Sequence, residues 1–292
     1  MGQGSGPIAG EVLTAMVRQA ADAVADTEAA AIADEPDGVH QHRVRVRRLR
    51  SILAGLRPQL DEVAAQRLRV EYGAWGGQLG LVRDIEVLAD VADGALDALG
   101  SDDPDARRRL VDDRRDEYRR DHARLVELAA TPRAAERSRL LAEFAQRPPL
   151  VDPEAPARDV LAATLRHEAR RVRRAAQGVD GSIGSYHLVR KAGRRMRYVA
   201  EAVRDAAPGL FGDEVDALAE AGDDIHGSLG DHRDALVFAR TLEQARALAG
   251  RAGESVLVYD ALLADAHERA GGKLESLEPA LAAVRHAAKR LP

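Results

Sequence analysis

The sequence predicts an all-α protein, and three observations carry that prediction. Aromatic residues make up only 3% of the 292 residues, whereas Ala, Leu, Val, Arg, Asp and Glu dominate, a composition that favours helices over sheets. Glycine and proline breaks separate long segments with helical patterning. A patterned basic segment also occurs twice, about half a chain apart. With 45% hydrophobic residues, the chain is apolar enough to fold around a core.

The breaks predict where the helices begin and end. The residues 1–7 are expected to form a disordered tail, and residues 8–292 a single domain. A connector over residues 147–156 contains Pro148, Pro149 and Pro153, which oppose a continuous helix, and it joins halves of about 8–146 and 157–292. About six helices are expected in each half. Their predicted breaks in the first half are Pro36, Gly38, Pro58, Gly76 with Gly77 and Gly80, Gly100, Pro104 and Pro132, and in the second half Gly178, Gly181, Gly184, Pro208, Gly212, Gly227, Gly230, Gly250, Gly253 and Gly271 with Gly272.

Charge and cysteine content exclude several classes of protein. The 43 Lys and Arg against 48 Asp and Glu give a net charge of -5, so any anion site has to be local. The absence of cysteine excludes disulfides, thiol catalysis and cysteine-based metal sites, and it favours the reducing cytoplasm. No stretch approaches the roughly 18 apolar residues of a membrane helix, and no secretory signal is expected.

Two motifs recur in the same order, which indicates an internal duplication. The first motif is repeated 147 residues further on, and the second, LGLVRD at 79–84 and LGDHRD at 229–234, is repeated 150 residues further on. The first motif pairs His40, Arg43, Arg47, Arg48 and Arg50 with His187, Arg190, Arg194, Arg195 and Arg197.

Helical geometry turns the first motif into a cationic face. At about 100° per residue, His40, Arg43, Arg47 and Arg50 share an arc of roughly 80°, next to an apolar stripe. The second copy has the same angles, with Lys191 and Arg195 flanking it as Arg48 flanks the first. A single cationic face of this kind is explained by exposure to solvent, or by ion pairs with the eight acids of residues 84–105. The repetition instead favours a shared groove for a polyanion, because the arginine fork matches phosphate oxygens.

The segments VHQHRVRVRRLRSIL and YHLVRKAGRRMRYVAEAV, each followed by LGxxRD, resemble the two signature repeats of CHAD domains, the histidine-containing α-helical domains. The resemblance covers about residues 8–291. It implies a helical bundle of two pseudo-symmetric halves around a central basic channel that binds inorganic polyphosphate. The implied ligand face comprises His40, Arg43, Arg47, Arg48, Arg50, His187, Arg190, Lys191, Arg194, Arg195 and Arg197. The second half departs from the pattern at Ala192, where the first half has Arg45.

Further residues are second-tier candidates. Arg18 and Arg166 occur at a similar offset of 148, and Arg170 and Arg173 add to the basic character of the segment with Arg166. Arg83 and Arg233 are expected either to reach the channel or to pair with acids. Asp84 and Asp234 are expected to orient an arginine rather than bind phosphate. Gly80 and Gly230 are interpreted as helix ends.

Other functions remain as alternatives. A metal site is disfavoured, because His40 and His42 lie about 200° apart on a helix and Arg-rich surroundings repel cations, although Asp223, Asp224, His226, Asp231 and His232 form a closer cluster. A phosphate-processing hydrolase lacks visible carboxylate or nucleophile motifs. A nucleic-acid module lacks stacking aromatics. We therefore expect a non-catalytic binding protein with no cofactor and no metal, without a membrane partner, in the cytoplasm at polyphosphate granules.

Overall fold

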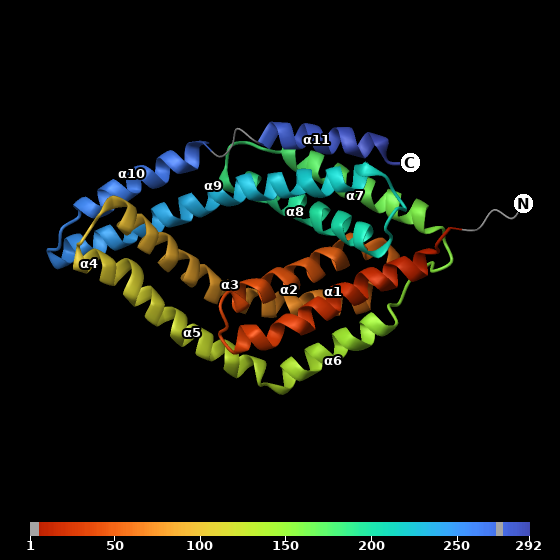
Figure 1. The fold of residues 1–292 in the computed structure, drawn as a ribbon, viewed down its shortest axis with the longest axis horizontal. Coiled ribbons are helices and arrows are strands. Elements are labelled where there is room, and N and C mark those ends of the chain that lie inside the picture. The colour runs from red at the N-terminus through yellow and green to blue at the C-terminus, as the bar shows by residue number, and fades with distance from the viewer. Residues whose placement is uncertain (1–5, 273–276) are drawn as a thin grey trace, which may run out of the picture.

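The computed structural model describes residues 6–272 and 277–292, and within these ranges it contains helices and no β-strand (Figure 1). The molecule is elongated, with the described chain ends toward one end and α4 with the turn between α9 and α10 at the other. The helices are α1 (Ala9–Ile32), α2 (Gly38–Gly55), η1 (Arg57–Gln59), α3 (Glu62–Leu99), α4 (Pro104–Arg107), η2 (Arg108–Asp112), α5 (Asp113–Ala129), α6 (Pro132–Gln146), α7 (Ala157–Gln177), α8 (Ile183–Ala206), α9 (Asp213–Ala252), α10 (Leu257–Gly272) and α11 (Leu277–Arg290).

Local signals set several helix ends. The Asp61 carboxylate accepts a hydrogen bond from the Ala64 backbone N–H at 2.9 Å, and the Ser182 hydroxyl accepts one from Ser185 at 3.1 Å, so each residue caps the free N–H groups of a first turn. At the other end, Gly100 and Gly253 take left-handed φ angles of 63° and 75° directly after α3 and α9. Glycine accepts this conformation without steric cost, which stops the helix.

The predicted breaks at Gly76, Gly77 and Gly80, and at Gly227 and Gly230, are wrong. All five glycines lie inside α3 and α9, which run without interruption for 38 and 40 residues. A glycine inside a helix costs only about 1 kcal/mol relative to alanine, so tertiary packing overrides it where no proline blocks the next turn. Gly80 and Gly230 are therefore not helix ends.

The segment 147–156 is free of helix and lies against the beginning of the chain. The backbone N–H groups of Ala9 and Gly10 donate to the carbonyls of Ala155 and Pro153 at 2.8 and 2.7 Å. Pro7, which belongs to the predicted tail 1–7, accepts from Ala157 N–H at 3.0 Å, while residues 1–5 of that tail lie outside the described residues. The connector thus fastens the first turn of α1 to the first turn of α7.

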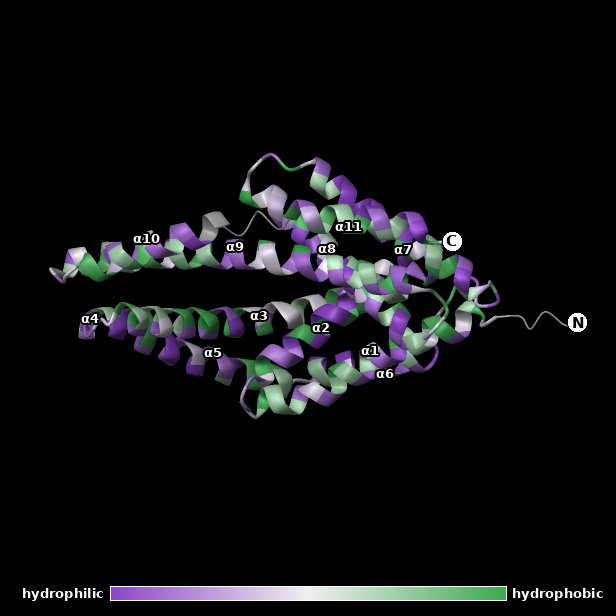
Figure 2. Ribbon diagram, turned by 45° about the horizontal axis from the view of Figure 1, so that its top comes forward, coloured by the Kyte–Doolittle hydropathy of each residue, from purple (hydrophilic) through white to green (hydrophobic). Residues whose placement is uncertain are grey.

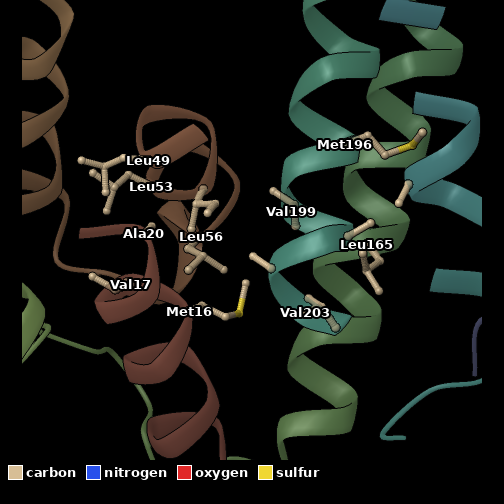
Figure 3. Packing of buried hydrophobic residues seen from close by; sticks show 14 of the residues in the cluster. Met16, Val17, Ala20, Leu49, Leu53, Leu56, Leu165, Met196, Val199 and Val203 are labelled. Carbon is tan, nitrogen blue, oxygen red and sulfur yellow. The ribbon is translucent and has the colours of Figure 1, made fainter. Parts of the chain in front are cut away.

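A large core joins the two halves of the chain at one end of the molecule. Met16 and Leu56 from the first half face Val199 and Val203 from the second (Figure 3). Helices α2 and α8 approach closely at Gly55, where a Cβ would lie 2.4 Å from Cγ2 of Val199. Burial of these side chains at roughly 25 cal/mol per Å² is the main force holding the halves together.

Ion pairs reinforce this contact between α2 and α8. A guanidinium nitrogen of Arg48 lies 2.8 Å from Oδ2 of Asp205, and the other terminal nitrogen lies 3.1 Å from Oε2 of Glu201. One arginine of the first half therefore binds two acids of the second.

A second core closes the opposite end of the molecule. The distal parts of α3 and α9 extend side by side from the large core to α4 and α10 (Figure 2). There Leu96 of α3, Leu110 of η2, Leu242 of α9 and Leu262 of α10 belong to one buried cluster. The two long helices are thus anchored at both ends, with space between them in the middle.

His42 is a core residue that organises α1, α2 and α3. The indole N–H of Trp75 donates to Nε2 of His42 at 2.8 Å, so Nδ1 carries the proton and donates to Oγ1 of Thr27 at 2.9 Å. Burial, followed by the charge of Arg137, lowers the pKa of His42 to about 4. The imidazole is therefore neutral and holds three helices together through hydrogen bonds.

Candidate functional site

A cavity of about 590 Å³ lies between the long helices, and both halves of the chain line it. Its walls come from α2 and α3 on one side and from α8, α9 and α10 on the other. The charged lining residues are Arg43, Arg47, Arg50, Asp84, His187, Arg190, Arg194, Asp231, Arg233, Asp234, Asp265 and Arg269.

Five arginines form what we call the cationic cluster: Arg43, Arg47 and Arg50 on α2, and Arg190 and Arg194 on α8. They occupy one face of each helix, as the spacing of three and four residues predicts. Burial, followed by the nearby charge of Arg47, lowers the pKa of Arg194 to about 9. The guanidinium remains charged at neutral pH, so this burial costs free energy in the absence of an anion.

Three arginines of the cluster hold unused hydrogen-bond donors. Nε of Arg47, Arg190 and Arg194 is buried and has no hydrogen-bond partner within the described part of the chain. A buried donor without a partner costs about 1 to 3 kcal/mol, and more on a charged group. The cluster therefore holds three unsatisfied donors, contributed by both halves.

Glycines of the long helices make room for the arginines opposite them. A Cβ on Gly80 would lie 3.6 Å from a terminal nitrogen of Arg43, and a Cβ on Gly230 would lie 3.3 Å from Nε of Arg190. The glycine of each LGxxRD motif therefore leaves space for the guanidinium of an arginine from the basic motif of the same half. This explains why the two motifs occur together.

The two predicted ligand histidines are placed differently. His187 lines the cavity, and burial, followed by the charges of Lys191 and Arg233, lowers its pKa. His40 is half-buried next to the cluster rather than on the cavity wall, and burial, followed by the charge of Arg83, lowers its pKa. Both side chains are more neutral at pH 6.5 than a free imidazole.

His226 is a candidate that the sequence assigned to a different role. It lies on α9 one turn before Gly230, and its buried Nε2 has no hydrogen-bond partner among the residues described. Burial, followed by the charges of Arg190 and Arg194, lowers its pKa to about 2. His226 is not one of the residues that line the cavity, although the repeat offset of 150 relates it to Gly76, which is one.

The acids around His226 were the predicted alternative metal cluster. Asp223 instead forms an ion pair with Arg197. Across residues 6–272 and 277–292, no group of three or more His, Asp or Glu side chains is arranged to hold a metal ion.

Other members of the predicted ligand face do not reach the cavity wall. Arg195 binds the fully buried carboxylate of Glu168, with Nε 2.6 Å from Oε2. Arg197 binds Glu201 through Nε at 2.6 Å. Arg48 binds acids across the halves, as described above, and Lys191 is exposed. Acids on α7, α8 and α9 thus pair with Arg48, Arg195 and Arg197.

The motif acids orient arginines. Oδ1 of Asp84 lies 3.1 Å from a terminal nitrogen of Arg43, and Asp234 lies 3.1 Å from Arg233. Arg233 also lines the cavity, whereas Arg83 forms an ion pair with Glu86 at 2.9 Å. For Arg233 both expected roles thus occur together, while Arg83 pairs with an acid.

The second-tier arginines lie elsewhere. Arg18 is exposed on α1. Arg166, Arg170 and Arg173 line a separate groove of about 540 Å³ between α7 and α11. The structure therefore does not bring these four residues to the cavity.

No helix within residues 6–272 and 277–292 combines the length and the hydropathy that spanning a bilayer requires.

Comparison with known proteins places the fold. The crystal structure of the CHAD domain from the plant Ricinus communis aligns with a TM-score of 0.70 at 22% identity, covering 100% of this chain and 95% of that one. PptA from Streptomyces chartreusis aligns with a TM-score of 0.69 at 20% identity, covering 97% and 99%.

Sequence comparison identifies the family. Uncharacterized proteins of two Mycobacterium tuberculosis strains are each 31% identical over 258 residues, which is 85% of this chain. The match covers 48% of their length, so this chain spans about half of these curated relatives. The sequence model of the CHAD domain matches residues 15–243, which include both basic helices and both LGxxRD motifs, and the chain therefore belongs to the CHAD domain family.

Proposed function

We propose that this chain binds inorganic polyphosphate in the cavity and does not hydrolyse it. The observation that carries the proposal is the set of buried, unpartnered Nε donors of Arg47, Arg190 and Arg194, contributed by both halves. Membership of the CHAD family supports the same ligand.

The chemistry of the cluster suits a chain of phosphates. Each guanidinium offers two parallel donors to phosphate oxygens and keeps its charge at any biological pH. The mutual repulsion of the five cluster arginines, four of which are half-buried, is offset when a polyanion enters. A channel that passes between two pseudo-symmetric halves, and recruitment to polyphosphate granules, belong to the same proposal.

Three of the four carboxylates that line the cavity support binding rather than catalysis. Asp84, Asp234 and Asp265 each contact an arginine, at 3.1 Å to Arg43, 3.1 Å to Arg233 and 2.8 Å to Arg269. Acids engaged in this way position cations, which is a task in ligand binding.

The decisive experiment is a titration of labelled long-chain polyphosphate, followed by anisotropy, with RNA as competitor at equal phosphate concentration. We expect polyphosphate to bind and RNA to compete poorly. The Arg47→Ala/Arg194→Ala variant should lose most of the affinity, whereas Arg120→Ala/Arg240→Ala, which removes two exposed arginines outside the cavity, should keep it. Equal competition by RNA would contradict the proposed ligand.

The non-catalytic part has its own test. Incubation of polyphosphate with the chain and Mg²⁺ or Mn²⁺ should release no orthophosphate and leave the chain length unchanged. Release that disappears in the Arg47→Ala/Arg194→Ala variant would show that the cavity is an active site.

A further inference from the structure

The cavity has a second kind of surface that polyphosphate does not use. Beyond the cationic cluster, the lining includes the charged residues Asp84, Asp231, Arg233, Asp234, Asp265 and Arg269 and an aliphatic and aromatic part, which we call the apolar wall. It consists of Val87, Leu88 and Val91 on α3, Ala235, Val237 and Phe238 on α9, and Ala266 on α10. A site for bare phosphates alone gains nothing from such a wall.

Two of these side chains are more exposed than a purely structural role requires. Val91 and Val237 have 39% and 38% of their surface exposed, yet they line a concave surface. Phe238 belongs to the second core and Leu88 packs against it, so this core supports the apolar wall. Exposed apolar side chains gathered in a cavity mark a place where an apolar group binds.

The cluster and the wall follow one another along the long helices. Gly76 lies next to the cluster and Val91 at the far end of the wall, about 22 Å further along α3 at 1.5 Å per residue. The volume of about 590 Å³ falls within the roughly 300 to 1,000 Å³ of small-molecule sites. One elongated ligand can therefore contact both surfaces.

We propose that the cavity binds an organic phosphate, with the phosphate or diphosphate group on the cationic cluster and an aliphatic chain along the apolar wall. This inference rests on the proposed function, because both ligands use the same arginines. The wall itself offers no hydrogen-bonding side chain, and Phe238 is only 6% exposed, so it presents little ring surface for stacking. These features favour an aliphatic chain over a nucleobase.

The test compares ligands that share a diphosphate. Calorimetry with the full chain measures pyrophosphate, geranyl diphosphate and ADP, with geraniol as the ligand without phosphate. We expect geranyl diphosphate to bind at least about tenfold more tightly than pyrophosphate, because several methylene groups leave water. ADP should gain less, and geraniol should not bind measurably.

Variants of the cavity then show which residues give geranyl diphosphate its higher affinity. Val91→Gln/Val237→Gln makes the wall polar at exposed helical positions and should abolish most of the advantage of geranyl diphosphate, with pyrophosphate unchanged. Val63→Gln/Leu248→Gln is the matched control, since it changes exposed apolar residues of the same two helices outside the cavity. Circular dichroism confirms that both variants are folded.

The outcomes separate this inference from the proposed function. Equal affinities for geranyl diphosphate and pyrophosphate, an advantage that survives in the wall variant, or ADP binding as tightly as geranyl diphosphate would each overturn the inference. Polyphosphate is titrated against the same proteins. If polyphosphate binds but the geranyl chain adds no affinity, only the inference is wrong. If geranyl diphosphate binds more tightly than pyrophosphate but polyphosphate does not bind, only the proposed function is wrong.

Discussion

Gly230 of α9 lies directly under the guanidinium of Arg190 of α8, so that a Cβ at this position would be 3.3 Å from both Nε and Nη2. The equivalent Gly80 leaves more room, with 3.6 Å between its virtual Cβ and Arg43. The same motif position therefore has different clearance in the two halves.

Gly230→Ala should weaken polyphosphate binding several-fold, because the added methyl group displaces Arg190 from its seat. Gly80→Ala is the matched control and should leave the affinity nearly unchanged. Both variants should be as stable as the wild type or more so, by up to about 1 kcal/mol, since alanine is the better helix former. Anisotropy and thermal unfolding measure the two effects, and equal affinities of the two variants would contradict the seating role.

Arg194→Met should stabilise the free protein while weakening polyphosphate binding. Burial lowers the pKa of Arg194, and its charge faces Arg47 and Arg190, so an apolar side chain of similar length relieves desolvation and repulsion. We expect the free energy of unfolding to rise by about 1 kcal/mol and the affinity to fall about 10- to 100-fold. Urea unfolding and a titration decide this, and a destabilised variant would show that Arg194 is already neutralised.

The salt dependence counts the phosphate contacts. Five cluster arginines predict a slope of log affinity against log salt of about -3 to -4, using the coefficient for single nucleic-acid strands. Arg47→Ala should make this slope shallower by about 0.7. Anisotropy across a salt series provides the measurement, and a wild-type slope near -1 would indicate a site for a single phosphate.

Polyphosphate binding should take up protons. Burial and neighbouring cations lower the pKa of His187 in the free protein, and a bound polyanion raises it by cancelling the field of the arginines. Affinity should therefore rise as the pH falls from the raised pKa of His187 in the complex to its lowered pKa in the free protein. Calorimetry in two buffers of different ionisation enthalpy measures the proton uptake on binding. This uptake should be smaller for His187→Gln than for the wild type. An unchanged uptake would show that His187 does not face the ligand.

The buried His42 should make the fold sensitive to acid. Its folded pKa of about 4 lies below the unfolded value of 6.5, so its contribution to stability is present above pH 6.5 and is lost as the pH falls toward 4. Between pH 7.5 and 5 the wild type should lose about 2 kcal/mol more than His42→Gln, in which the amide oxygen accepts from Trp75. Urea unfolding at both pH values tests this, and parallel losses would rule it out.

Periodicity was sufficient to predict the cationic face, because the spacing of Arg43, Arg47 and Arg50 alone determines that they share a side of α2. Spacing does not reveal which cations meet an acid from a distant helix. Arg197 shares the predicted arc of Arg190 and Arg194, yet Asp223 on α9 forms an ion pair with it. The division of the motif into cavity and flanking arginines is a tertiary property.

Glycine was the residue type whose role the sequence indicated least well. Gly80 and Gly230 resemble helix ends in the sequence, because the composition does not show that an arginine of another helix lies above them. Gly100 and Gly253 were predicted as breaks for the same reason and do end their helices. His226 was considered only as part of a disfavoured metal cluster, whereas in the structure the charges of Arg190 and Arg194 on α8 lower its pKa.

The second core has a mechanical consequence. Helices α3 and α9 are each packed into a core at both ends, the large core at one end and the Leu96 and Leu242 cluster at the other. Neither helix can move away from the other without opening one of these cores, so the cavity between them resists widening. In the proposed function, this frame admits a slender anion such as polyphosphate without deformation, whereas a double-stranded nucleic acid would have to open one of the two cores. The stiffness of the frame would then favour one kind of polyanion over the other.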